Sequence, residues 1–319
     1  MTKKLKFKKN WFFTSLKIFH RKSNNTAKHF PKLFEAAEKS PYTIPGLSKI
    51  LSLDKNQQLD FCTAMTPQGL TFTEEYLLIS AYCHEHIHHS VIYVLDRISG
   101  IKIKTVILPD FPHAGGLAYD PIHRKLWISN THRNYAAITA IPLVDLIQHK
   151  TKLAPIGYQQ KIVLKDLPRA SFLSYDEGYL YVGLFSLKDK GQFACYPIDT
   201  KGNLRQTTTK NFVESPYKNL TLLQKIQGLA VYLQYVIFSQ SWGPQAGKLF
   251  IFDIHLTKDF SNLKEAVKII STPPYLEQIW VEDHYLYALF ESGAAHYRTK
   301  TPFIMDEVLQ IDLKKLLKS

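Results

Sequence analysis

The sequence predicts an all-β fold of the β-propeller class, in which four-stranded antiparallel sheets form blades around a central channel. Apolar strand pairs recur through most of the chain, and further apolar segments follow each pair at a spacing near 50 residues. Four strands per repeat at this period are typical of a propeller. The 319-residue chain is 45% hydrophobic and 13% aromatic, which is ample for such a core.

Four strand pairs align without a gap, and each second strand opens with tyrosine. They are residues 68–80 (QGLTFTEEYLLIS), 171–183 (SFLSYDEGYLYVG), 227–239 (QGLAVYLQYVIFS) and 277–289 (EQIWVEDHYLYAL). A fifth copy, residues 115–129 (GGLAYDPIHRKLWIS), fits if its turn is two residues longer. The repeats therefore predict five blades. Six blades is the alternative, if residues 200–225 or 40–60 contain a weak sheet.

Third strands are predicted at 90–96, 136–143, 191–199, 247–254 and 306–313, and fourth strands at 103–109, 159–164 and 266–271. The fifth blade lacks an outer strand of its own, and residues 59–65 (LDFCTAM) are a spare apolar segment before the first blade. We expect this N-terminal strand to pair with residues 306–313 and close the ring. Closure protects the sheet edges that an open array would expose.

Outside the repeats we expect a basic tail over residues 1–45, with a short helix near 32–40, and the propeller domain over 46–319. The tail is predicted to be dispensable for folding. Residues 1–22 hold eight Lys or Arg and no acid, interleaved with aromatic side chains, within a chain of net charge +13. Such a segment suits an acidic membrane surface, and a solvated terminus is the alternative. Nucleic-acid binding is not indicated, because no recognition motif accompanies the charge.

No run of about 18 apolar residues occurs, so no transmembrane helix is expected. The stretch WFFTSL is too short for the core of a signal peptide. We expect a monomer in the cytoplasm or at a membrane surface. Three widely spaced cysteines, Cys62, Cys83 and Cys195, argue against a disulfide framework.

The repeat segments carry a family resemblance. Together TPQGLTFTEEYLLISAY, HAGGLAYDPIHRKLWIS, IQGLAVYLQYVIFSQSWG and PPYLEQIWVEDHYLYALFES resemble a group of bacterial propeller proteins of unknown function. These are similar in style to the YncE-like and NHL-like propellers, and the resemblance covers about residues 43–313. It implies the propeller fold and leaves export open, but it implies no chemistry.

Propeller geometry brings the start of each inner strand and each loop between second and third strands to one end of the channel. Seven of the thirteen histidines fall on this predicted loop face. The candidate ligand-binding residues there are Gln68, His113, Gln227, Trp242, Glu277 and Glu291. Gln68 and Gln227 occupy equivalent positions, where each carboxamide offers a donor and an acceptor.

The densest histidine cluster is CHEHIHH, residues 83–89. If it is extended, His84, His86 and His88 project to one side and could bind Zn, Ni or Cu. A solvated polar loop is the alternative. Cys83 is interpreted as an inward-facing residue at a strand end.

Two functions remain open. The first is a non-catalytic propeller that binds a small polar ligand or a protein partner on the loop face. The second is a channel-mouth hydrolase or lyase that uses Glu277 and His113, with or without a metal. A desolvated Glu277 would suit proton transfer, whereas pairing with His113, Arg133 or Arg298 would make it a structural tie. No G-x-S-x-G, P-loop or G-x-G-x-x-G motif is present.

Overall fold

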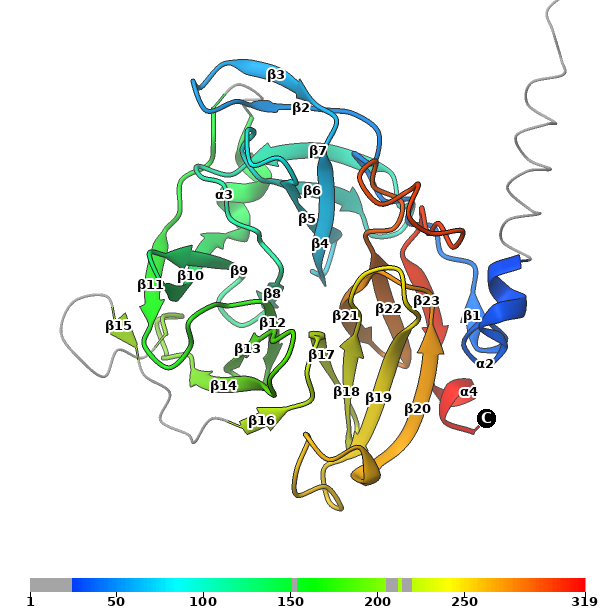
Figure 1. Ribbon diagram of the computed structural model, residues 1–319. Coiled ribbons are helices and arrows are strands. Elements are labelled where there is room, and N and C mark those ends of the chain that lie inside the picture. The colour runs from blue at the N-terminus through cyan, green and yellow to red at the C-terminus, as the bar shows by residue number, and fades with distance from the viewer. Residues whose placement is uncertain (1–24, 151–153, 205–211, 214–219, 319) are drawn as a thin grey trace, which may run out of the picture.

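The computed structural model describes residues 25–150, 154–204, 212–213 and 220–318. Five sheets surround a common axis as the blades of a propeller (Figure 1). Blade one contains β4 (Met65–Phe72), β5 (Tyr76–Cys83), β6 (Val91–Asp96) and β7 (Lys102–Ile107). Blade two contains β8 (Leu117–Asp120), β9 (Lys125–His132), β10 (Tyr135–Pro142) and β11 (Gln160–Leu164), with β15 (Phe212–Val213) parallel to β11.

The other three blades complete the ring. Blade three contains β12 (Phe172–Asp176), β13 (Tyr179–Leu184), β14 (Gly191–Pro197) and β16 (Leu220–Leu222). Blade four contains β17 (Ile226–Tyr232), β18 (Tyr235–Gln240), β19 (Gly247–Asp253) and β20 (Ala266–Thr272). Blade five contains β21 (Leu276–Glu282), β22 (Tyr285–Phe290), β23 (Leu309–Asp312) and β1 (Ala37–Glu38). The predicted five blades of four antiparallel strands are confirmed, and β15 adds a fifth, parallel strand to blade two.

An N-terminal strand closes the ring, but it is not the predicted segment, residues 59–65. Ala37 pairs with Ile311 and Glu38 with Gln310, so β1 is the outer strand of blade five. Residues 59–62 instead form β3 (Leu59–Cys62), which pairs with β2 (Ile50–Leu53) as a separate hairpin. Leu59, Asp60 and Phe61 are exposed, so β3 lacks the apolar face that an outer blade strand would bury.

The segment before β1 belongs to the core. Helix α2 (Pro31–Glu35) places Leu33 in the hydrophobic cluster of blade five, together with Ala36. The cluster also includes residues of α4 (Leu313–Lys318). Ala37 and Glu38 therefore lie in the propeller although the sequence placed them in the tail. The expectation that residues 1–40 are dispensable for folding stays a prediction, against which the packing of Leu33 and Ala36 argues. Residues 1–22, the expected membrane-contacting stretch, lie outside the described residues.

Two short helical elements cover loops between strands. Helix α3 (Leu143–Gln148) follows β10, and the 3-10 helix η1 (Leu263–Glu265) precedes β20. Within the described ranges, no helix is long and apolar enough to cross a membrane.

Candidate functional site

The propeller axis is occupied by the side chain of Gln278, which is fully buried. Its Oε1 accepts hydrogen bonds from the amides of Leu70 (3.1 Å) and Leu117 (2.8 Å). Its Nε2 donates to the carbonyl oxygens of Leu117 (2.6 Å) and Leu173 (3.0 Å). One carboxamide thus joins blade five to blades one, two and three.

Gln278 occupies the column that is glycine in three of the other repeats. A Cβ built on Gly69 would lie 2.9 Å from the Gln278 Oε1, and one on Gly116 would lie 2.3 Å from the amide nitrogen of Leu173. The glycines therefore give the inner strands room to approach the axis. Gln278 was not predicted as a site residue, although the alignment places it where three other repeats have Gly, which marks it as unusual.

On the loop-face side of Gln278, three inner strands share a backbone irregularity. The pairing register shifts between Pro67 and Leu70 in blade one, between Ile226 and Gly228 in blade four, and between Leu276 and Ile279 in blade five. These shifts contain Gln68, Gln227 and Glu277, which the repeat alignment predicted to be equivalent. A bulge re-aims the side chain at that position, and such bulges are common beside binding sites.

These side chains meet at a buried pair of carboxyl groups, Glu277 and Glu291, which are 4% and 8% exposed. The two carboxyls share a hydrogen bond. Gln68 Nε2 donates to Glu291 Oε2 at 2.9 Å, and Gln227 Nε2 donates to Glu277 Oε1 at 3.3 Å. The structure therefore brings four of the six predicted ligand-binding residues into one network.

Burial raises the pKa of both carboxyl groups. The pKa of Glu277 is raised well above its usual value by burial and by the negative charge of Glu291. Burial raises the pKa of Glu291 to about 8, against the opposing hydrogen bonds from Gln68 and Glu277. Because two adjacent carboxylates out of water repel each other, the pair retains a shared proton at neutral pH.

Aromatic side chains surround the carboxyl pair. The ring of Tyr82 lies 4.0 Å from that of His113, and Tyr275 lies 4.8 Å from Tyr297. Burial, and then the negative charge of Glu291, raises the pKa values of Tyr82, Tyr275 and Tyr297. These tyrosines lie close enough to Glu291 for its charge to act on them, and we call Gln68, Gln227, Glu277, Glu291 and the three tyrosines the carboxyl mouth.

His113 is exposed to solvent, and its ring lies against that of Tyr82. Desolvation, and then the positive charges of His86, His84 and Arg169, lower the pKa of His113. The imidazole is therefore neutral at physiological pH. Among the described residues no hydrogen bond joins His113 to Glu277.

The cationic partners considered for Glu277 lie elsewhere. Arg298 forms a two-pronged ion pair with Asp306, at 2.7 Å for each nitrogen, and Arg133 is exposed in the β9–β10 turn. Trp242 is also exposed, with its ring 5.6 Å from that of Phe185. No contact described in the structure joins Trp242 to the carboxyl pair.

The three histidines considered as metal ligands do not converge. His84 stacks on His296 at 3.5 Å between ring centroids, and His86 lies 5.5 Å from Tyr82. His88 is buried on a different side, beside Cys83. The prediction assumed an extended segment, but the chain turns here: the amide of His86 donates to the carbonyl oxygen of Cys83, and His86 has a φ of 54°.

A different group with metal-ligand chemistry forms instead. Cys62, Cys83 and His88 are all buried, and their ligand atoms lie within 4.8 Å of one another. The interaction between the two thiols raises the pKa of Cys62 and lowers that of Cys83. Cys83 was interpreted from the sequence as a strand-end residue, and Cys62 was not considered as its partner, because 20 residues and a hairpin turn separate them.

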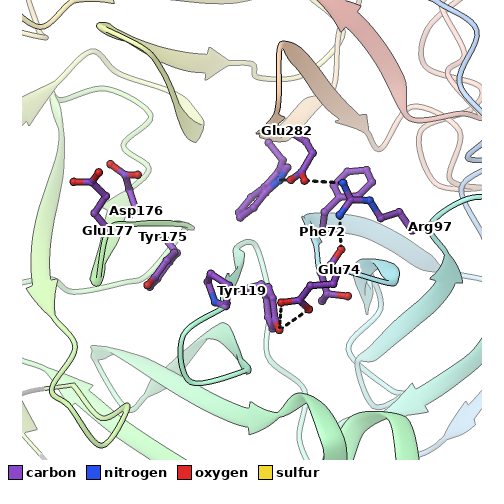
Figure 2. A pocket seen from close by; sticks show the side chains of 11 residues that line it. Phe72, Glu74, Arg97, Tyr119, Tyr175, Asp176, Glu177 and Glu282 are labelled. Carbon is purple, nitrogen blue, oxygen red and sulfur yellow. Dashed lines mark hydrogen bonds and ion pairs between the residues drawn. The ribbon is translucent and has the colours of Figure 1, made fainter.

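The opposite end of the channel contains a pocket of about 260 Å³, lined by turns between first and second strands and by Arg97 from the β6–β7 turn (Figure 2). Arg97 pairs with Glu282 at 2.6 Å, and Tyr119 donates to Glu74 at 2.8 Å. Asp176, whose pKa is raised by burial and then by Glu177, completes an acidic lining. Sequence reasoning did not predict this pocket, since nothing in the individual turns marks them as convergent.

Comparisons with known proteins assign no family to the chain. No protein-family profile and no curated protein matches the chain. A nidogen/laminin complex matches at 14% identity and a TM-score of 0.42, covering 78% of this chain and 84% of the other. A PQQ-bound aldose sugar dehydrogenase from Streptomyces coelicolor matches at 10% identity and a TM-score of 0.45, covering 85% of this chain and 97% of the other. A periplasmic gluconolactonase from Pseudomonas aeruginosa matches at 14% identity and a TM-score of 0.40, covering 68% of this chain and 61% of the other. No function follows from similarities at this level.

Proposed function

We propose that the protein is a binding propeller whose carboxyl mouth takes a small polar ligand carrying an ammonium group. The buried, hydrogen-bonded pair of Glu277 and Glu291 is the observation that carries the proposal. Two carboxyl groups out of water are costly unless a cation or a proton compensates them. Within the described chain no Lys or Arg is hydrogen-bonded or ion-paired to either carboxyl. The positive charge of Lys300 lowers the pKa of Glu291, but burial outweighs it and the pKa stays raised, so a proton compensates the pair in the free protein.

The surroundings favour an organic cation as the compensating group. Tyr82, Tyr275 and Tyr297 lie within reach of the charge of Glu291, and an ammonium group is attracted both to carboxylates and to aromatic faces. Gln68 and Gln227 hold the carboxyl oxygens in place through their amide groups. Their carbonyl oxygens remain available as acceptors for further N–H or O–H groups of a ligand.

The competing account is that the pair only staples neighbouring blades, since its hydrogen bonds join blade five to blades one and four. A staple does not require ionisable groups, however. Gln278 joins four blades with a neutral carboxamide in the adjacent position. Two acids in place of two amides add a desolvation cost that binding of a cation would offset.

Acid–base catalysis is the second candidate function, because a carboxyl group with a pKa near 8 can donate a proton at neutral pH. His113 would not be the base partner, since no hydrogen bond in the described structure connects it to Glu277. Binding without turnover and proton-transfer catalysis differ in outcome: only catalysis converts the bound compound to a product that mass spectrometry detects.

A thermal-shift titration tests the proposal, with ethanolamine, putrescine and choline as probes and ethylene glycol as the uncharged control. Since the cation must replace the shared proton, affinity should rise by up to tenfold per pH unit between pH 6 and 8. We expect Glu277→Gln to abolish the shift and Asp176→Asn, at the opposite end of the channel, to leave it. Absence of a shift with all three ammonium probes would contradict the ammonium class. Loss of the shift in Asp176→Asn alone would place binding in the other pocket.

A further inference from the structure

The buried group of Cys62, Cys83 and His88 lies outside the carboxyl mouth and is not explained by it. Cys62 ends the β2–β3 hairpin, Cys83 ends β5, and His88 lies between β5 and β6. The exposed fractions of the three residues are 1%, 1% and 5%. Two separate chain segments, the end of β3 and the end of β5 with the loop that follows it, therefore bring two thiols and one imidazole to one buried place.

The spacing of the donor atoms suits a single tetrahedral metal ion. Zinc bonds of about 2.3 Å to sulfur and 2.0 Å to nitrogen, at a tetrahedral angle, place the two ligand atoms about 3.5 Å apart. The Cys83 Sγ and the His88 Nδ1 lie 3.6 Å apart. All three ligand atoms lie within 4.8 Å of one another, so small side-chain rotations suffice to complete the set.

The orientation of His88 also fits coordination. With Nδ1 directed at Cys83, the opposite nitrogen, Nε2, lies 3.7 Å from the Asp60 carboxylate. A carboxylate behind a ligating imidazole fixes the ring and its tautomer in many metal sites. Two sulfurs and one imidazole favour Zn²⁺ or Cu(I) over Mg²⁺ and Ca²⁺, which prefer oxygen ligands.

From this geometry we propose that Cys62, Cys83 and His88 bind one thiophilic metal ion of the Zn²⁺ class, with Asp60 as a positioning residue. Three protein ligands leave one tetrahedral position for water. The metal–Cys62 bond would attach the β2–β3 hairpin to blade one. The backbones of Asp54 and His88 already pair there in an isolated antiparallel β-bridge, and Ser52 Oγ donates to the His89 carbonyl oxygen.

Such a metal would also fix the loop that faces the mouth. Residues 84–87 lie between the two ligands Cys83 and His88, and within them His84 and His86 contact Tyr82. The metal would thus hold both ends of this loop. The proposal does not depend on the ligand that the mouth binds.

Anaerobic titration of tag-free, reduced, full-length protein with Co²⁺ and Zn²⁺ tests the site. We expect one Co²⁺ per chain, with thiolate-to-metal charge-transfer absorption and the intense visible bands of a tetrahedral ion, and displacement by Zn²⁺. Cys83→Ser should abolish the charge-transfer band, while the matched control Cys195→Ser, in blade three, should retain it. Asp60→Asn should weaken Zn²⁺ affinity by about 10–100-fold while the spectrum is kept.

Three outcomes would overturn the proposal. The reduced protein could fail to bind Co²⁺ stoichiometrically. Binding could occur without a thiolate band, which would place the ion on the exposed histidines. The wild-type protein could instead yield a Cys62–Cys83 disulfide by thiol counting and bind no Zn²⁺ after reduction. The wild-type spectrum decides even if Cys83→Ser does not fold, and His88→Gln then provides the second ligand test by a change in the visible bands.

Discussion

Glu277→Gln should make the protein more stable at pH 8 and flatten the dependence of its stability on pH. In the wild type the folded-state pKa of Glu291 is about 8 against an ordinary 4.5. Because a raised carboxyl pKa means that the folded state binds the proton more tightly, this stabilisation is complete below pH 4.5 and is lost as pH rises to 8. The difference of 3.5 units, at about 1.36 kcal/mol each, sets an upper limit of about 5 kcal/mol.

In the variant, the new amide donates to Glu291 in place of the shared proton and still accepts from Gln227. Glu291 can then ionise beside a neutral neighbour, so its pKa falls and the free energy of unfolding at pH 8 should rise by about 1–3 kcal/mol. Urea denaturation at pH 5, 6.5 and 8 measures this. The matched control is Glu177→Gln, an exposed glutamate at the opposite end, which should change stability by less than about 0.5 kcal/mol. A Glu277→Gln variant that loses stability at pH 8, with the wild-type pH slope, would refute the reasoning.

Three further predictions concern the ring and the tail. Gln278→Ala should lower the free energy of unfolding by at least about 3 kcal/mol, because it leaves buried backbone groups of three blades unpaired. Gln227→Ala removes one hydrogen bond of 3.3 Å and should cost about 1 kcal/mol or less. Urea denaturation of both variants checks this. Deleting residues 1–39 removes β1 and buried Leu33, so its melting temperature should fall by several degrees relative to deletion of 1–24; equal melting would show that β1 does not hold the ring closed. Deleting 1–24 should abolish co-sedimentation with acidic vesicles at low salt, at about 1 kcal/mol per basic residue near the surface, and unchanged binding would dismiss the membrane role.

The repeat made the blades predictable because each blade must solve the same packing problem. An inner strand, a tight turn and a second strand that opens with tyrosine recur at Tyr76, Tyr179, Tyr235 and Tyr285, and β5, β13, β18 and β22 begin at these residues. The same alignment predicted the equivalence of Gln68, Gln227 and Glu277. Their convergence on one end of the channel then follows from topology alone.

Features outside the repeat were not predictable in this way. The closing strand is two residues long, and its position depends on Leu33 and Ala36 packing into blade five, which no local pattern in β1 reveals. The hairpin segment 59–62 resembles an apolar strand in sequence, yet it pairs with 50–53. A strand two residues long carries too little periodicity to identify its partner.

The prediction of metal ligands in the histidine-rich loop was wrong for a different reason. An extended backbone was assumed, and the positive φ of His86 reverses the chain, so that His84 and His88 point to different neighbours. Turn geometry of this kind depends on the hydrogen bond between the His86 amide and the Cys83 carbonyl oxygen. Because a single residue in the left-handed region redirects every side chain after it, spacing in the sequence could not identify the ligands.

The central claim is that a proton is shared by Glu277 and Glu291 in a site made to receive a cation. Carboxyl ¹³C NMR of protein labelled at glutamate measures this directly, with Glu277→Gln used to assign the pair. We predict a carboxyl titration with an apparent pKa near 8, shifted to lower pH by saturating ethanolamine, putrescine or choline. Titration of both carboxyls near their ordinary value of 4.5, unaffected by any of these ammonium probes, would contradict the claim.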